Sequence, residues 1–272
     1  MSMNSMAAPG LGHALDLSGT SPTPFSRLVR TELRKTWDTR AGLWLLICTA
    51  LLTAAVMVIQ LAVVVVQDLV VSYNDFLTST NFSIGLLLPV IGILLVTSEW
   101  SQRTAMVTFS LEPHRGRVIL AKLVVGLLLG IAAVVIALGL AAICNLLLNG
   151  MSDLGGAWDL SLKQTAYFVL LQEIGMLTGF AFAALLLNSP AAIVLYMVYQ
   201  FVLPTIFGIG GALIGWFEDL KPWIDFGASQ TPMFDGTGMT GEDWAHFAVS
   251  GFIWLVIPLV IGVRRVLTAE VK

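Results

Sequence analysis

One acidic side chain lies deep inside an otherwise apolar stretch of the chain. Glu173, in the segment YFVLLQEIGML, stands about nine residues from the end of that stretch. A helix would therefore carry it roughly 13 Å into a bilayer, at ~1.5 Å per residue. A carboxyl group at that depth should face a bundle interior or a wet cavity, or be protonated. Glu173 is thus a candidate for a polar contact in a substrate path or for a proton site, with a structural hydrogen bond to a neighbouring helix as the alternative.

A second group of polar residues runs from Glu99 to Lys122, EWSQRTAMVTFSLEPHRGRVILAK, between two apolar segments. Glu99 and Arg103 stand four residues apart and can pair along a helix. Simple anchoring by Lys and Arg on the cytoplasmic side would explain the basic charges of this loop. It would not explain a loop of helical length, so we interpret the loop as a docking element for a cytoplasmic partner.

The same loop has the pattern of a short amphipathic helix. Trp100, Val107 and Leu111 share a face at helical spacing. Pro113 is expected to end the helix at about Glu112, because the residue before a proline disfavours the helical conformation.

Motifs of common enzymes are absent from the sequence. It contains no GxxxxGK[ST], no HExxH and no GxSxG. His13, His114 and His246 have no paired ligands nearby, and Cys48 and Cys144 both lie in apolar runs. We therefore expect no catalytic residue, no metal site, no disulfide and no cofactor in this chain.

Composition places the chain in the membrane. Of its 272 residues 57% are hydrophobic and 11% are charged, and its mean hydropathy is +0.88. A soluble domain carries roughly 25% charged residues. Several apolar runs reach the roughly 20 residues that a helix needs to cross a bilayer, and they are continuous, whereas a barrel strand alternates. The fold class expected is an all-α polytopic membrane protein.

The apolar runs divide the chain into six expected transmembrane helices within a domain at 42–263. Their approximate bounds are 42–66, 82–97, 118–148, 165–187, 191–210 and 246–263. The Ser-, Gly- and Pro-containing segment 1–24 is expected to be a disordered cytoplasmic tail, and 264–272 a second cytoplasmic tail. The polar and aromatic segment 211–245 is expected to form short re-entrant or interfacial helices.

Residues 25–41 have the pattern of an amphipathic helix, FSRLVRTELRKTWDTR. The apolar positions are Phe25, Leu28, Val29, Leu33 and Trp37, and the opposite face is basic. Such a helix is typical of the membrane interface. A cytoplasmic helix packed on a partner is a compatible alternative.

Charge asymmetry predicts the topology. Twelve of the fourteen Lys and Arg fall in the tails and loops assigned to the cytoplasm, and only Lys163 and Lys221 fall on the other side. Ten of the seventeen Asp and Glu fall on that other side. Because short cytoplasmic loops carry an excess of Lys and Arg, both termini are expected in the cytoplasm.

With these features, the chain from Phe25 to Lys272 resembles the permease subunit of a type-2 ATP-binding-cassette (ABC) exporter. The resemblance rests on the N-terminal amphipathic helix, six spans with a long outer segment before the last, the ending GVRRVLTAEVK, and the loop that begins at Glu99. The loop's order of residues is similar to the family's coupling region. One departure is at Ala105, where the family often has a small residue preceded by Gly-Thr and this chain has Arg103-Thr104.

The resemblance implies a bacterial inner-membrane protein that moves a substrate, in the direction of export, with ATP hydrolysed elsewhere. Two cytoplasmic ATPase subunits would hold the ATP and Mg, a second copy or paralogue of the permease would complete the membrane part, and no nucleic acid is involved. The residues implied in ATPase coupling are Glu99, Trp100, Arg103, Thr104, Val107, Leu111, Glu112, Pro113 and Arg115. The alternative reading of the chain is a secondary transporter or channel that uses Glu173.

Overall fold

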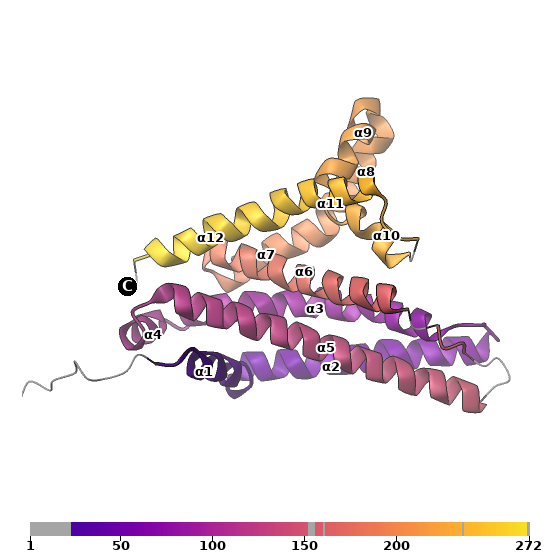
Figure 1. The fold of residues 1–272 in the computed structure, drawn as a ribbon, viewed down its shortest axis with the longest axis horizontal. Helices are drawn as coiled ribbons and strands as arrows, with labels where there is room; N and C mark the ends of the chain where they lie inside the picture. The colour runs from indigo at the N-terminus through magenta and orange to yellow at the C-terminus, as the bar shows by residue number, and fades with distance from the viewer. Residues whose placement is uncertain (1–22, 152–155, 160, 236, 271–272) are drawn as a thin grey trace, which may run out of the picture.

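A computed structural model describes residues 23–151, 156–159, 161–235 and 237–270, and within them the chain forms helices and no strands. Six helical stretches of this part are long and apolar enough to cross a membrane (Figure 1). They are Arg40–Val66 (α2), Tyr73–Ser101 (α3), Arg115–Met151 (α5), Leu162–Leu186 (α6), Ser189–Leu213 and Gly241–Thr268. By the length and composition of these helices the chain is a multi-pass membrane protein, and the predicted all-α class is confirmed.

The last two spans are not uniform α-helices. The fifth consists of α7 (Ser189–Met197), a π-helical segment η1 (Val198–Val202) and α8 (Leu203–Leu213). The sixth consists of α11 (Gly241–Gly251), a π-helical segment η3 (Phe252–Val256) and α12 (Ile257–Thr268). Between them lie α9 (Gly215–Ile224), the short 3-10 turn η2 (Ala228–Gln230) and α10 (Thr231–Phe234), and α9 stands away from the bundle (Figure 1).

All six spans begin somewhat earlier than hydropathy predicts, and the second and sixth differ most. The second was expected at 82–97, but α3 already begins at Tyr73, where Ser72 and Asp75 form a capping box: the Asp75 carboxylate accepts the Ser72 backbone N–H at 2.8 Å. The sixth, expected at 246–263, begins at Gly241 after an equivalent box formed by Thr240 and Asp243. The polar first turns of these helices carry little hydropathy signal, which explains the difference.

The core of the bundle is the contact between α3 and α6. Of the most apolar 18 residues of each, 61% are buried, against 11% in each of the last two spans. The two backbones approach closely because glycines, which have no side chain, occupy positions where α3 and α6 are in contact. A Cβ at Gly92 would lie 2.6 Å from the carbonyl oxygen of Met176, and one at Gly179 would overlap the carbonyl of Pro89. These glycines therefore set the distance between the two central helices.

Pro89 lies inside α3 and interrupts its hydrogen bonding. Proline has no N–H, so the carbonyl of Gly85, four residues earlier, loses its partner within the helix. The hydroxyl of Tyr196 on α7 donates to that carbonyl at 3.2 Å. Tyr196 is buried, and through this contact the fifth span satisfies the group that the proline leaves open.

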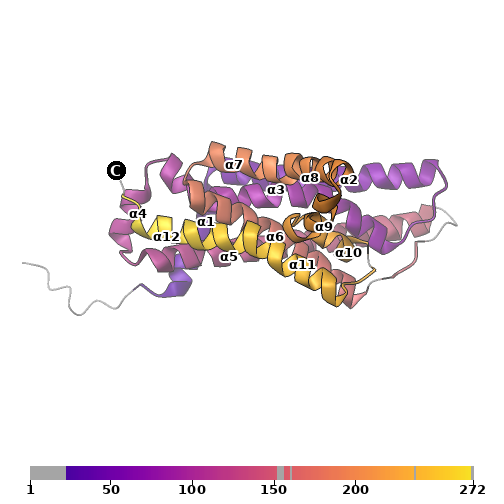
Figure 2. The same cartoon turned by 90° about the horizontal axis from the view of Figure 1, so that it is seen from above.

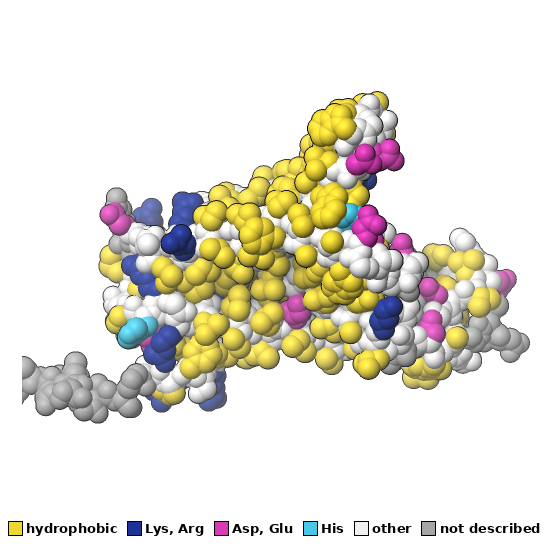
Figure 3. All heavy atoms as spheres, turned by 45° about the horizontal axis from the view of Figure 1, so that its top comes forward, with side chains coloured by type: hydrophobic (Ala, Val, Ile, Leu, Met, Phe, Trp, Pro, Cys, Tyr) yellow, Lys and Arg dark blue, Asp and Glu magenta, His cyan; other side chains and the backbone are white. Residues whose placement is uncertain are grey.

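Charge separates along the long axis of the molecule. The helix α1 (Phe25–Asp38), the short helix α4 (Ala105–Leu111) and the end of α12 lie together at one end (Figures 1 and 2). On the face shown in Figure 3, Lys and Arg gather mainly at that end, and most Asp and Glu lie toward the other. We call these the basic end and the acidic end. A broad hydrophobic surface lies between them.

Candidate functional site

Two carboxylates and two ammonium groups meet at the basic end, where α1, α3 and α5 converge. Nζ of Lys122 lies 2.6 Å from Oε2 of Glu32 and 3.3 Å from Oε1 of Glu99. Nζ of Lys35 lies 2.6 Å from Oε1 of Glu32 and 2.7 Å from Oε1 of Glu99. We call Glu32, Lys35, Glu99 and Lys122 the charge quartet. Its signs balance, which allows the groups to be buried together.

The quartet is withdrawn from solvent. Glu32, Glu99 and Lys122 are each 5% exposed, whereas Lys35 is partly exposed. Burial alone would lower the pKa of Lys35, but the charges and hydrogen bonds of Glu32 and Glu99 outweigh it and raise the pKa above its usual range. Charged groups without such partners would not remain buried here.

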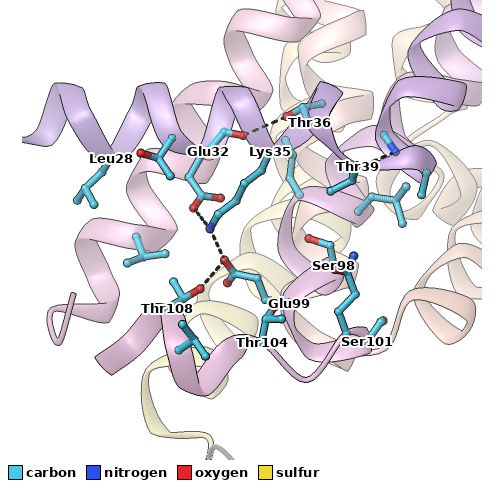
Figure 4. A pocket seen from close by; sticks show the side chains of 18 of the residues that line it. Leu28, Glu32, Lys35, Thr36, Thr39, Ser98, Glu99, Ser101, Thr104 and Thr108 are labelled. Carbon is cyan, nitrogen blue, oxygen red and sulfur yellow. Dashed lines mark hydrogen bonds and ion pairs between the residues drawn. The ribbon is translucent and has the colours of Figure 1, made fainter. Parts of the chain in front are cut away.

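The helix α4 joins the quartet through Thr108, whose hydroxyl donates to Oε1 of Glu99 at 3.0 Å. Lys35 reaches the same carboxylate from α1, so Glu99 is held from two sides (Figure 4). Glu99 belongs to the last turn of α3, and α4 begins only at Ala105. The carboxylate thus lies at a joint between two helices.

The chain bends between α3 and α4, and this bend corrects one prediction. Arg103 has a φ of 57°, in the left-handed region that non-glycine residues seldom adopt. It therefore lies outside both helices, and the helical pair expected between Glu99 and Arg103 is not formed. Glu99 pairs with Lys35 and Lys122 instead, because the bend turns Arg103 toward solvent.

Trp100 differs from its expected place for the same reason. It belongs to α3 and not to the loop helix, and its ring lies 6.3 Å from that of Phe109 on the inner side of α4. The helical face that was expected to combine Trp100 with Val107 and Leu111 therefore contains only the last two. Val107 and Leu111 are 60% and 78% exposed, and Met106, next to them, is 54% exposed. All three of these apolar side chains of α4 are thus exposed, and Val107 and Leu111 also border a cavity between α1 and α4.

The end of α4 is fixed by a second buried acid. Glu112 follows the last helical residue, as Pro113 predicted, and its carboxylate lies 3.0 Å from Nη1 of Arg117 and 3.2 Å from Nδ1 of His114. Arg117 also donates to the carbonyl of Thr23, ahead of α1. Glu112 therefore connects α4 with the start of α5.

Arg115 connects α4 with the end of the sixth span. Its Nη1 donates to the carbonyls of Val266, Leu267 and Ala269 at 3.2, 3.3 and 2.7 Å. Its guanidinium lies 4.7 Å from the ring centre of Phe109. Arg115 thus caps the C-terminus of α12 and is engaged within the chain.

A cavity of about 700 Å³ lies between α1 and α4 (Figure 4). Thr31, Lys35 and Thr36 line it from α1. The α4 side is lined by Thr104, Val107, Thr108 and Leu111. Its deeper wall is apolar and is formed by Leu45 of α2 and by Ile91, Leu94 and Leu95 of α3. The cavity is a cleft bordered by the polar ends of the spans.

Glu173 lies far from this cleft, in the middle of α6. Both of its carboxyl oxygens are buried, and neither finds a hydrogen-bond partner within the described part of the chain. The carboxyl group rests against Gly130 of α5, where a Cβ would collide with it. Its neighbour Gln172 donates to Asn81 of α3 at 2.7 Å, so the structural bond in this region is made by the amide and not by the acid.

The described residues contain no group of three or more His, Cys, Asp or Glu that could hold a metal ion. No protein-family model and no curated protein matches the chain.

Reasoning from the sequence missed three members of the quartet. Glu32 is not singled out by the sequence, because it lies in a helix whose polar face is mainly basic. Lys35 is predicted only as one of the basic residues of that face. Lys122 is predicted only as a charged residue at the opening of the third span, whereas it is buried within α5. A lysine inside an otherwise apolar run was the signal that could have revealed a buried ionic partner.

Proposed function

We propose that this chain is the membrane-spanning permease subunit of an ABC exporter and that α4 docks onto a separate ATPase. The observation that carries this proposal is the exposure of three apolar side chains of α4, Met106, Val107 and Leu111, of which the last two border the open cleft. These apolar side chains are exposed at the basic end, beyond the spans that lipid would cover. Exposed apolar residues outside the bilayer are typical of a surface that another protein covers.

The charge quartet supports a mechanical role for this helix. Thr108 of α4 contacts Glu99 of α3, which in turn pairs with Lys35 of α1 and Lys122 of α5. A force applied to α4 would therefore reach two spans, α3 and α5, and the helix α1 through short, charge-assisted bonds. Closure of two ATPase subunits around ATP and Mg²⁺ would bias the bundle between inward-open and outward-open states.

The proposal also specifies the partner subunits of the chain and the membrane in which it lies. Two ATPase subunits pair with this chain and with a second permease, which is a copy or a paralogue. The chain itself hydrolyses no ATP and binds no nucleic acid. The protein lies in the inner membrane of a bacterium, with the basic end and both termini in the cytoplasm, as the distribution of Lys and Arg favours.

The test is a pull-down of the tagged chain from its own membranes in a mild detergent, after crosslinking in the intact membrane. The expected result is an ATPase in stoichiometric amount that is lost on Val107→Asp or Leu111→Asp. Val70→Asp is the matched control, because Val70 is also exposed and apolar but lies between α2 and α3 at the acidic end. Absence of any ATPase from crosslinked membranes would contradict the proposal.

The unpartnered carboxyl of Glu173 favours a second candidate, a self-contained transporter or channel. An acid without a partner in the apolar band is typical of a proton or ion path. Transport by proteoliposomes that contain this chain alone, driven by a proton gradient and lost on Glu173→Gln, would support this candidate over the first.

A further inference from the structure

A small cavity lies toward the acidic end, beside the turn that follows α9. Its volume is about 60 Å³, and its walls include Tyr199, Gln200, Phe207, Asp225, Phe226 and Trp254. One buried water needs roughly 10–15 Å³ by this measure. The cavity therefore has room for about four waters or for one compact head group.

Asp225 supplies a negative charge to this cavity. The residue is 3% exposed, and its Oδ1 accepts the backbone N–H of Ala228 at 2.9 Å. Within the described part of the chain it forms no ion pair. A buried carboxylate is strongly stabilised by a positive partner, and this one borders an open space instead.

Four aromatic rings, those of Tyr199, Phe207, Phe226 and Trp254, line the cavity beside Gln200, Leu203, Pro204 and Gly227. The ring of Tyr199 lies 5.3 Å from that of Trp254, and the ring of Phe226 lies 5.4 Å from that of Phe247. The indole N–H of Trp254 donates to the carbonyl of Ile224 at 2.7 Å, which fixes this ring beside the turn that holds Asp225. The negative faces of aromatic rings attract cations.

The fifth and sixth spans, which border the cavity, are both π-helical where they line it. Tyr199 and Gln200 belong to η1, and Trp254 belongs to η3. A π-helical segment is rare and occurs frequently at functional sites, because its wider turn redirects side chains. Here two such segments direct a phenol, an amide and an indole to one cavity.

We propose that this cavity binds the ammonium head of a small organic amine, with Asp225 as its counter-ion and the rings of Tyr199 and Trp254 as its walls. An anion would be repelled by the carboxylate, and a neutral ligand would leave the carboxylate unpaired. The volume limits the buried part to a primary ammonium and one or two carbons. This proposal is independent of the ATPase partner and of transport.

The test is a titration of the full chain, reconstituted in lipid nanodiscs, with ethylammonium chloride, followed by saturation-transfer NMR of the ligand methyl signal. We expect saturable binding of ethylammonium and none of ethanol, its neutral counterpart. Asp225→Asn should weaken binding tenfold or more while leaving the thermal midpoint unchanged, because the amide oxygen can still accept from Ala228. Asp219→Asn, an exposed acid of α9, is the matched control and should bind as the unaltered chain does.

A second variant keeps the proposal falsifiable if Asp225→Asn disturbs the fold. Phe207→Leu removes one ring of the cavity and should weaken ethylammonium binding several-fold. The proposal is overturned if ethylammonium does not saturate, or if Asp225→Asn folds and binds within threefold of the unaltered chain. In either case Asp225 serves only to accept the backbone N–H of Ala228.

Discussion

Nζ of Lys122 lies 2.6 Å from Oε2 of Glu32, although the two residues are 90 positions apart in the chain. Both side chains are buried, and they connect the start of α5 with the middle of α1. A contact between elements so distant in sequence fixes α1 to the bundle. Because a buried charge depends on its partners, the position of α1 is coupled to that of α3 and α5.

The first prediction concerns the removal of one cation from the quartet. Lys122→Met should lower the free energy of unfolding by about 3–5 kcal/mol, because Glu32 and Glu99 would share only Lys35 in a buried site. Equilibrium unfolding in mixed detergent micelles measures this change. Arg34→Met is the matched control: its ion pair with Asp38 is 76% and 56% exposed, and its loss should cost about 0–1 kcal/mol. Equal effects of the two changes would contradict the buried quartet.

The second prediction concerns pH. The pKa of Lys35 is raised above its ordinary value of 10.5, so its contribution to stability is complete below pH 10.5 and is lost as the pH rises through the raised pKa. The thermal midpoint of the chain should therefore exceed that of Lys35→Met by a constant amount from neutral pH to about pH 10. The difference should shrink at higher pH. A difference that stays constant up to pH 12 would show that the Lys35 ammonium contributes nothing.

The third prediction separates two arginines near α4. Arg115→Gln should destabilise the chain by about 1–3 kcal/mol, because the last carbonyls of α12 lose a charged donor. Arg103→Gln should change stability by about 0.5 kcal/mol or less, since Arg103 is exposed. Thermal unfolding in detergent compares them. If the ATPase docks as proposed, Arg103→Gln should weaken its capture without this loss of stability.

The fourth prediction concerns Pro89 and Tyr196. Tyr196→Phe should cost about 1–3 kcal/mol, because the carbonyl of Gly85 would be left without a donor. In a Pro89→Ala background the restored N–H can bond to Gly85, so the same change should cost less. The double-mutant cycle, measured by unfolding in detergent, reports the difference. Additive effects would mean that Tyr196 does not compensate for the proline.

The fifth prediction concerns the protonation of Glu173. A carboxyl group with no partner in an apolar band should be neutral, and it should therefore react with the lipophilic dicyclohexylcarbodiimide. Mass spectrometry should locate the adduct at Glu173, and Glu173→Gln should abolish it. Asp75, which accepts hydrogen bonds at the start of α3, should remain unlabelled. Labelling of Asp75 in preference to Glu173 would contradict a neutral Glu173.

The parts of the fold that the sequence predicts are those with a local signal, namely hydropathy for the spans and capping residues for the helix starts. The apolar runs predict six spans because their signal is local and strong. The capping residues Ser72 and Thr240 carry an equally local signal, and reading them would have placed the starts of two helices correctly.

The site was less predictable because its contacts are long-range. Pro113 correctly indicated the end of α4, since proline acts on its own neighbours. The pair between Glu99 and Arg103 was wrong because a left-handed residue breaks the helix between them, and no local pattern indicates that bend. The charge quartet depends on three elements packing together, which periodicity within one element does not report.

The quartet also has a consequence for biogenesis. A ribosome makes Glu32 and Lys35 first, Glu99 next and Lys122 last. Until Lys122 emerges, the first three groups carry a net charge of −1, and the neutral cluster cannot close. We therefore expect the amino-terminal helix to take its final position only after Lys122 has been synthesised, because a chain truncated before Lys122 leaves the two carboxylates with Lys35 as their single cation.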